Sequence, residues 1–390
     1  MNAGVWDAVV VGAGPAGLIA ARTLAADGHA VLVVEEHAAV GYPVHCTGLL
    51  GTEAFDELDL PRETIRGTIS RAFFHGPQGP PVPVEADHIS AAVIDRGEFD
   101  AALAAEARTH GASFRLATRV ESMAVTPSGV EFRLSGGAES LRAHACILAC
   151  GANYRFNRDL GLGVPSTLVQ SAQAEIPFPA AAHVDVYIGR ELAPNGFGWV
   201  VPFERAGAHW ARLGLLCTEN ARSRFAALAA RVWRERNLQG PLPEPRLKAL
   251  PLGPVERTFA DRTLAAGDAA GLVKPTTGGG IYYSLLSGRL AATVLSSGLK
   301  DDVLDRGRLE DYERQWSGRL GGEIRAGKAF RRLATRIDDR GIASLLELAR
   351  VDGLVPILKR HGNFNWHRGA VVALLRNAGF RRALLSSFWS

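Results

Sequence analysis

The sequence predicts an α/β fold with a parallel sheet at its core, and three observations carry this prediction. An apolar, β-branched run from Trp6 to Val11 leads straight into a glycine-rich turn and a helix-like stretch that stops at Gly28. A second short run, Ala30 to Val34, has the continuous apolar character of a strand buried on both faces. Residues 263–295 again place a strand, a turn and a helix in that order. Strands that alternate with helices are typical of a parallel sheet covered by helices.

The composition is that of a folded protein with more than one subdomain. The chain has 390 residues, of which 47% are hydrophobic and 22% charged, and this balance excludes a disordered or fibrous protein. A chain of this length favours two or three packed subdomains. Its longest uncharged apolar run, Ala8 to Ala21, has 14 residues, whereas a helix that spans a bilayer needs roughly 20. We therefore predict no transmembrane helix.

The cysteines indicate a reducing compartment. They are too few for a disulfide scaffold, and none stands at the paired spacing of a zinc site. We expect no metal centre and a cytoplasmic location. The four cysteines are Cys46, Cys146, Cys150 and Cys217.

Positive charge is concentrated near the C-terminus. Residues 321–390 contain 13 Lys and Arg against 5 Asp and Glu, so this segment carries a net charge of +8 and the rest of the chain −4. A basic tail on a mildly acidic body favours an anionic partner such as a lipid surface or a nucleic acid. The alternative is a helical face that is merely exposed to solvent.

The first forty residues predict a dinucleotide site. Gly12 to Gly17 reads Gly-Ala-Gly-Pro-Ala-Gly and lies between a strand and a helix, with Glu35 at the end of the next strand. In this arrangement Gly12 permits the tight turn, Gly14 lets the backbone approach a pyrophosphate, and Gly17 lets helix and strand pack closely. The helix N-terminus offers free N–H groups to the phosphates, and Glu35 can accept hydrogen bonds from ribose hydroxyls.

A second loop far along the chain distinguishes FAD from NAD. Asp268 follows a strand-like run, and Gly278 to Gly280 open a helix. A carboxylate at a strand end can bind a polyol, and a helix start made of glycine presents bare N–H groups to an anion or a flavin edge. FAD needs such a loop because its ribityl chain and ring lie far from its adenosine. We therefore predict FAD as the cofactor.

Several segments together resemble known flavoproteins. The unit from Gly12 to Glu35, the segment Asp95-Arg96-Gly97-Glu98-Phe99-Asp100 and the pair Gly267-Asp268 resemble the FAD-binding fold of aromatic hydroxylases and flavin halogenases. Three further segments, 43–48, 274–283 and 194–202, are similar to the cysteine-glycine loop, the flavin loop and the Pro-x-x-Tyr-x-Trp-x-Phe-Pro signature of the geranylgeranyl reductase family. The resemblance covers roughly Asp7 to Arg325.

The signature segment departs from the family pattern at two positions. Phe197 replaces the tyrosine, and Val201 replaces the second aromatic residue. Residues 197–202 also resemble a degraded Trp-x-Trp-x-Ile-Pro motif of flavin halogenases. No segment resembles the lysine motif of a halogenase, because Lys274 lies in the flavin loop instead.

The resemblance implies a discontinuous Rossmann-like FAD-binding domain with two additions. We expect the FAD domain to comprise residues 1–60, 90–165 and 250–325. An inserted mixed or antiparallel β-sheet subdomain for the substrate is expected at 61–89 and 166–249, where apolar and polar residues alternate. Residues 326–390 are expected to form a C-terminal helical region.

The resemblance also implies an FAD-dependent oxidoreductase that acts on CH–CH groups. Reduced flavin N5 would deliver hydride to an isolated double bond of a prenyl chain on a lipid, a quinone or a pigment precursor. Such a bond has no carbonyl to polarise, so catalysis depends on placement in an apolar, water-free tunnel. The alternative is a monooxygenase or halogenase that acts on an aromatic substrate through a flavin hydroperoxide. A third hypothesis is a flavin-containing binding protein without turnover.

The same reasoning selects candidate site residues. Pocket candidates for catalysis are Cys46, Trp199 and Tyr282, with His45 as a candidate proton donor. Substrate contacts are expected from Phe197, Trp199, Pro202 and Tyr283. The expected FAD contacts are Gly12, Ala13, Gly14, Pro15, Ala16, Gly17, Glu35, Glu36, Cys46, Thr47, Gly48, Arg96, Val120, Gly267, Asp268, Gly278, Gly279, Gly280 and Ile281.

The partners follow from the same resemblance. No second glycine-rich unit is present for a nicotinamide, so the expected donor is a transient NAD(P)H, a ferredoxin or a quinol. Apolar residues from Val371 onward fall at helical spacing among arginines, and Phe388 and Trp389 follow. This basic amphipathic helix is expected either to lie peripherally in a membrane interface or to cap the substrate sheet. A prenyl substrate favours the membrane, and no nucleic-acid partner is expected.

Overall fold

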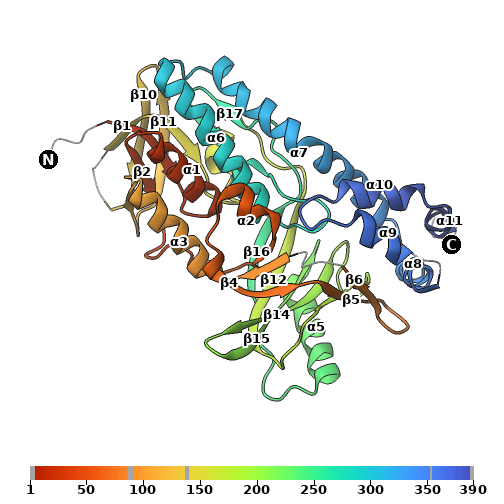
Figure 1. Ribbon diagram of the computed structural model, residues 1–390. Coiled ribbons are helices and arrows are strands. Elements are labelled where there is room, and N and C mark those ends of the chain that lie inside the picture. Colours follow the sequence, from red (N-terminus) through yellow and green to blue (C-terminus); the bar gives the residue numbers. More distant parts are fainter. Residues whose placement is uncertain (1–4, 87–90, 137–139, 352–353, 387–390) are drawn as a thin grey trace.

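The computed structural model of this protein describes residues 5–86, 91–136, 140–351 and 354–386. These residues form three β-sheets and eleven α-helices. In Figure 1 the first sheet lies at the N-terminal side, the second sheet lies below it, and the last helices lie at the opposite end. The predicted fold class, α/β with an additional sheet and a helical C-terminal region, is confirmed.

The first sheet has a parallel core. Its strands in order are β17 (Phe259–Ala260), β18 (Thr263–Ala265), β11 (Ser140–Leu148), β1 (Trp6–Val11), β2 (Val31–Val34) and β8 (Ser113–Arg115), and the hairpin β9 (Val120–Thr126) and β10 (Gly129–Leu134) pairs with the start of β11. Val9 lies opposite Leu32 on one side and opposite Cys146 on the other. Every residue of β2 is buried, as a strand covered on both faces requires.

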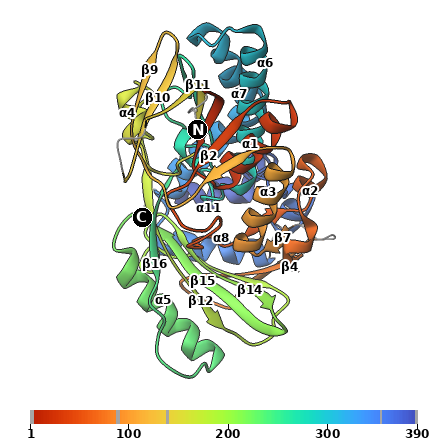
Figure 2. The ribbon, with the colours of Figure 1, turned by 90° about the vertical axis from the view of Figure 1, so that its left-hand side faces the viewer.

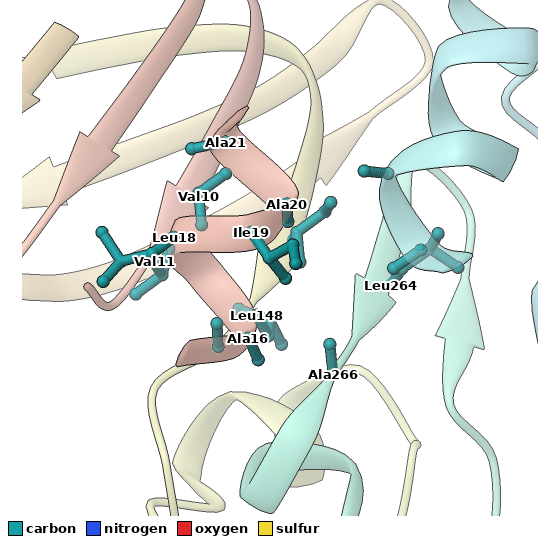
Figure 3. Packing of buried hydrophobic residues seen from close by; sticks show 14 of the residues in the cluster. Val10, Val11, Ala16, Leu18, Ile19, Ala20, Ala21, Leu148, Leu264 and Ala266 are labelled. Carbon is teal, nitrogen blue, oxygen red and sulfur yellow. The ribbon is translucent and has the colours of Figure 1, made fainter. Parts of the chain in front are cut away.

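Three helices cover this sheet: α1 (Pro15–Ala26), α3 (Arg96–Thr109) and α6 (Ile281–Asp301). Figure 3 shows Ile19 of α1 close to Leu148 of β11, and Leu264 of the neighbouring strand β18 belongs to the same buried cluster. α6 lies close against α1, since a Cβ at Gly288 would meet the Ala16 carbonyl oxygen at 2.2 Å. This packing fixes α1, and with it the glycine-rich turn at its N-terminus.

The second sheet is mostly antiparallel. Its strands in order are β16 (Arg246–Pro251), β12 (Leu168–Pro177), β15 (Ala208–Cys217), β14 (Phe197–Arg205), β13 (Val184–Tyr187), β5 (Arg71–His75) and β6 (Val82–Glu85), and β5 runs parallel to β13. Helix α5 (Ala221–Arg236) covers the outer face with Phe225, Leu228 and Val232, as Figure 2 shows from the side. The inner face is turned toward the first sheet.

Short elements join the two large sheets. Strands β3 (Leu49–Gly51), β7 (Ala91–Ile94) and β4 (Ile65–Ile69) form a small sheet between them. Helix α2 (Glu53–Leu58) and the 3-10 turn η1 (Arg62–Thr64) flank this small sheet in the chain. Helix α4 (Arg155–Asp159) lies beside β9 and β10 of the first sheet in Figure 2, and its Asn157 donates to Ala269 of the 3-10 turn η2 (Gly267–Ala270).

The C-terminal part is helical. It consists of α7 (Arg306–Ala334), α8 (Asp339–Val351), α9 (Leu354–His361), α10 (Arg368–Arg376) and α11 (Ala378–Ser386). The single basic helix expected after Val371 is two helices, because Asn377 takes an extended conformation and its side chain caps α11 by accepting from the Phe380 N–H at 2.9 Å. The predicted Phe388 and Trp389 lie outside the described residues.

Two predicted domain boundaries fall inside regular elements. The boundary at 249/250 lies within β16, and the boundary at 325/326 lies within α7. The predicted limits of the three domains stay predictions. Among the helices of the described ranges, we find none with both the length and the apolar character needed to cross a bilayer.

Candidate functional site

A large cavity lies where the two large sheets meet the C-terminal helices. Its volume is about 1570 Å³, whereas a pocket for one small ligand usually has roughly 300–1,000 Å³. Its wall runs from the glycine turn after β1, along the inner face of the second sheet, to α8 and α9. The cavity therefore has room for a dinucleotide and a second ligand side by side.

The glycine turn presents an open helix N-terminus to this cavity. Gly12 has φ +106°, and a Cβ there would lie 2.5 Å from the Ala149 carbonyl oxygen, so a larger residue is excluded. Gly14 is the N-cap of α1, where no side chain accepts a hydrogen bond from the helix, and nothing lies within 4 Å of a Cβ built on it. Free N–H groups and the positive end of a helix dipole suit the pyrophosphate of FAD.

Glu35 is fixed beside the turn. One of its carboxylate oxygens accepts from the Ala13 N–H at 2.8 Å, and the other accepts from the His37 N–H at 2.9 Å. Glu35 lines the cavity together with Glu36 and Val120. The oxygen that accepts from the His37 N–H also lies 2.5 Å from the His37 ring Nδ1, so the oxygen that accepts from Ala13 is the one with a lone pair left for a ribose hydroxyl.

The second glycine loop lies beside Asp268. The Asp268 Oδ1 atom is 3.1 Å from the position of a Cβ at Gly280, and the Lys248 Nζ atom is 3.6 Å from Asp268 Oδ2. Gly278 to Ile281 line the cavity. This arrangement suits the ribityl chain and ring edge of FAD, the role for which the sequence selected these residues.

Arg96 brings a partly buried cation to the cavity wall. Its guanidinium donates to both carboxylate oxygens of Asp100, at 3.2 and 2.7 Å. Burial by itself lowers the pKa of Arg96, but Asp100 and the Cys46 sulfur outweigh it and the net shift is upward. Burial also raises the pKa of Asp100, against the effect of Arg96.

Cys46 and His45 stand on the same wall. All four cysteines are free, and the Cys46 sulfur accepts from the Gly48 N–H at 3.4 Å. Both ring nitrogens of His45 are buried without a hydrogen-bond partner among the described residues. Burial, then Lys248 and Arg246, lower the pKa of His45 to about 4. His45 is therefore a neutral imidazole at neutral pH and is not a charged proton donor.

The Cys46 loop is held from behind by the second sheet, and sequence reasoning missed the residues that hold it. Arg212 of β15 is fully buried and donates to the carbonyl oxygens of Thr47 at 2.8 Å and Ile94 at 2.9 Å. Gln173 of β12 donates to the Cys46 carbonyl oxygen at 3.1 Å. The sequence does contain one indication of this role, a lone arginine in the otherwise apolar run 211–217. A charged residue is rarely buried in such a strand unless it has a partner, so this arginine predicts a buried partner elsewhere in the chain.

The inner face of β14 forms the wall beside this loop. Phe197, Trp199 and Val201 line the cavity, and the Trp199 indole lies over Gly214, where a Cβ would be 2.5 Å from the ring. Pro202, which we expected to contact the substrate, does not line the cavity. Side chains alternate between the two faces of a strand, so Pro202 points away from the face that carries Trp199 and Val201.

The two tyrosines of α6, Tyr282 and Tyr283, also lie away from the cavity in which we expected them. Tyr282 is buried, and its hydroxyl donates to Glu57 at 2.6 Å while its ring packs against Trp366. Tyr283 is 1% exposed and packs in the main core. Neither tyrosine is on the wall of the cavity, so we withdraw them as pocket residues.

Three glycines expected as FAD contacts are not on the cavity wall, and each lies close against other residues. A Cβ at Gly17 would meet the Gly12 carbonyl oxygen at 2.0 Å, and a Cβ at Gly48 would meet Arg212 Nη1 at 2.2 Å. A Cβ at Gly267 would meet the Ser284 hydroxyl at 2.9 Å. The other expected FAD residues do line the cavity: Gly12, Ala13, Gly14, Pro15, Ala16, Glu35, Glu36, Cys46, Thr47, Arg96, Val120, Asp268, Gly278, Gly279, Gly280 and Ile281.

The C-terminal region contacts the second glycine loop, which the sequence did not indicate. Lys274 is 5% exposed, and its Nζ donates to the Phe364 carbonyl oxygen at 2.7 Å and lies 4.3 Å from the centre of the Phe364 ring. His367 hydrogen-bonds the Thr276 hydroxyl, and burial followed by Lys274 lowers the pKa of His367 to about 3. The tail is thus part of the site.

We expect Lys274 to make stability depend on pH. Burial lowers the pKa of Lys274 to about 7 from the ordinary 10.5. Between these pH values the unfolded chain binds a proton that the folded chain does not, so the free energy of unfolding should rise with pH by up to about 1.4 kcal/mol per pH unit. Lys274→Met should lack this slope, and Lys300→Met, at an exposed lysine, should keep it. Denaturant unfolding across this interval measures the slopes, and parallel profiles for Lys274→Met and the wild type would contradict the prediction.

Comparison with known proteins places these features in context. Residues 6–167 match the family described as pyridine nucleotide-disulphide oxidoreductase. A digeranylgeranylglycerophospholipid reductase of Methanosphaerula palustris is 32% identical over 80% of this chain and 81% of its own length. The reductase of the same name from Methanoculleus marisnigri is 30% identical, over 88% of this chain and 89% of its own.

Solved structures share the fold. A geranylgeranyl bacteriochlorophyll reductase-like protein from Thermoplasma acidophilum has a TM-score of 0.83 over 98% of this chain and 99% of that chain, at 22% identity. The halogenase PltM has a TM-score of 0.71 over 97% and 90%, at 17% identity. At such identities the likeness establishes the architecture alone.

Proposed function

Because this chain belongs to the geranylgeranyl reductase family of FAD-dependent oxidoreductases, we propose that it reduces isolated carbon–carbon double bonds of prenyl chains. The observation that carries the proposal is the apolar inner face of the second sheet, which borders the FAD loops in the same cavity. An isolated alkene offers nothing to polarise, so an apolar wall beside the cofactor is what its reduction requires.

The residues divide into those that hold the cofactor and those that hold the chain. We assign the α1 N-terminus to the pyrophosphate, Glu35 to the ribose, and Asp268 with the loop 278–280 to the ribityl chain and ring edge. Reduced FAD supplies the hydride when it is bound. Trp199 and Cys46, which both line the cavity, would contact the alkene and hold it in place, and the apolar wall would exclude water.

The substrate that we propose is a prenylated lipid, with quinones and pigment precursors as further members of the class. Two relatives above are named for a digeranylgeranyl glycerophospholipid, which is therefore the first substrate to test. For the electron donor we propose a transient NAD(P)H, a ferredoxin or a quinol.

We also propose that the protein associates peripherally with membranes through its C-terminal helices. The last turns of α9 and α10 carry Lys359, Arg360 and Arg376, and Val351 at the end of α8 is 69% exposed. Basic helices with exposed apolar residues bind anionic lipid surfaces. Sedimentation with anionic vesicles, compared with neutral ones, tests this association, and equal binding to both would contradict it.

Anaerobic turnover tests the reductase proposal. The purified protein with its FAD is reduced by dithionite, mixed with a digeranylgeranyl glycerophospholipid under argon, and analysed by mass spectrometry. We expect two hydrogens to be gained per reduced bond, together with reoxidation of the cofactor. If the cofactor stays reduced until oxygen enters and the lipid is unchanged, the proposal is wrong, and aromatic substrates with halide become the next test.

A matched pair of variants ties the activity to the cavity. Trp199→Ala removes an aromatic wall residue and should lower the rate by about tenfold or more, since misplacement of a reacting bond is costly. Trp233→Ala changes a tryptophan of α5 whose indole donates to the Gly240 carbonyl oxygen, away from the cavity, and should leave the rate near that of the wild type.

A further inference from the structure

The C-terminal helices border the end of the cavity that lies far from the glycine turn. Ile342, Leu345 and Leu346 of α8 and Leu358 of α9 line it there. Figure 1 places α8 and α9 at the opposite end of the molecule from β1 and β2, beside the tip of β5 and β6. A ligand that lies along the cavity from the FAD loops therefore meets these two helices last.

One face of α8 is built for this position. Ile342, Leu345 and Leu346 stand at the i, i+3, i+4 spacing of a single helix face, and all three are half-buried and line the cavity. The neighbouring Leu348 faces α11, since its two methyl carbons lie 3.4 and 3.5 Å from the position of a Cβ at Gly379. α8 thus carries cavity leucines and packing leucines on different faces.

Polar contacts at both ends attach α8 to the second sheet. The Asp339 carboxylate accepts from the Arg190 N–H at 2.5 Å and the Glu191 N–H at 3.3 Å, just after β13. At the other end Arg350 donates to the Pro80 carbonyl oxygen at 2.6 Å, in the β5–β6 turn. Between them, the Leu346 side chain fills the space above Gly76, where a Cβ would be 2.4 Å away.

The loop after α9 is attached to the FAD side. Lys274 donates to the Phe364 carbonyl oxygen, and Asn365 donates to Glu53 at 3.0 Å. The wall is therefore fixed relative to both the sheet and the FAD loops. A fixed distance between a wall and a reacting centre limits how much of a chain can pass that centre.

We propose that the apolar residues of α8 and α9, with Leu346 and Leu358 at the centre, form a stop for the prenyl chain and so set the chain length accepted and the double bonds reduced. This inference rests on the proposed reductase function. It assigns a specificity-determining role to a segment in which the sequence shows no motif.

The test measures binding and reduction separately. Equilibrium binding of radiolabelled geranyl, farnesyl, geranylgeranyl and geranylfarnesyl alcohols to the FAD-loaded protein should show an affinity that rises with length and then stops rising. In Leu346→Ala and in Leu358→Ala the affinity should still increase at the next longer alcohol, which each variant should bind about tenfold more tightly than the wild type does. Leu346→Phe should shorten the accepted chain. The same series with reduced protein then gives the number of hydrogens added to each chain.

Leu348→Ala is the matched control, because it shortens the same residue type in the same helix on the face toward α11. It should leave the length profile unchanged even where it costs stability. If Leu346→Ala and Leu358→Ala keep the wild-type length profile with FAD fully bound, the inference is wrong. If the alcohols bind with the expected profile but none is reduced, the proposed function fails while the stop is supported. If no prenyl alcohol binds, both fail.

Discussion

Replacement of Arg212 by methionine is expected to lower the free energy of unfolding by about 3–5 kcal/mol, because it removes one partner of a buried ionic network. Arg212 is 0% exposed, and its Nε donates to Glu175 at 3.1 Å while Nη1 donates to the carbonyl oxygens of Thr47 and Ile94. Without the guanidinium these acceptors lose a buried donor. Urea unfolding gives the change in free energy directly.

The same substitution should weaken FAD binding. Thr47 belongs to the loop that lines the cavity, and Arg212 fixes its carbonyl from behind. The loss of one charge-assisted hydrogen bond predicts roughly a tenfold or larger increase in the dissociation constant of FAD. Arg212→Lys keeps the charge but places its donors on one compact nitrogen, which lacks the planar fork that lets Nε and Nη1 of Arg212 reach separate acceptors, so it should fall between methionine and the wild type.

Arg222→Met is the control for this experiment. Arg222 pairs with Glu244 on the surface, where the two side chains are 61% and 85% exposed, and such pairs contribute little to stability. An Arg212→Met protein with the unfolding midpoint and FAD affinity of Arg222→Met would contradict the role assigned to Arg212. A loss of FAD affinity at Arg212→Lys with unchanged stability would show that the positioning effect is separable from the effect on folding.

Gly17→Ala is expected to abolish stable FAD binding. A Cβ at Gly17 would lie 2.0 Å from the Gly12 carbonyl oxygen, 3.1 Å from Val10 Cγ1 and 3.2 Å from the Ala149 Cβ. Backbone cannot yield as a side chain does, so α1 must move away from β1 and the glycine turn must change shape. Overpacking of this kind costs about 1–3 kcal/mol or more.

The measurement is the FAD content of the purified protein together with its unfolding midpoint. Gly318→Ala makes the same change in α7, at an exposed helical glycine where nothing lies within 4 Å of the new Cβ. It should raise stability by about 0.5–1 kcal/mol, since alanine is the better helix former. Full FAD occupancy in Gly17→Ala would show that the close packing of α1 on β1 is not required.

The sequence by itself determined the parallel sheet and most of the FAD loops, because both depend on neighbours in the chain. The strand from Trp6 to Val11, the glycine turn and Glu35 lie within thirty residues of one another, and their spacing dictates the unit. FAD as the cofactor followed from the second loop, with Asp268 and Gly278 to Gly280, and the family from the segments 43–48, 194–202 and 274–283. The alternation of side chains along a strand also places Pro202 and Trp199 on opposite faces of β14, and this follows from the sequence once 197–205 is a strand.

Only the tertiary structure determines the contacts between segments that are distant in the chain. Tyr282 meets Glu57 rather than the cavity, Arg212 meets the loop at Thr47, and Leu346 reaches the space above Gly76. Such pairs are formed by how sheets and helices pack, and no local pattern encodes them. The C-terminal helices show this most clearly: their sequence specifies amphipathic helices, but only the packing against β6 and the FAD loops makes them a wall of the site.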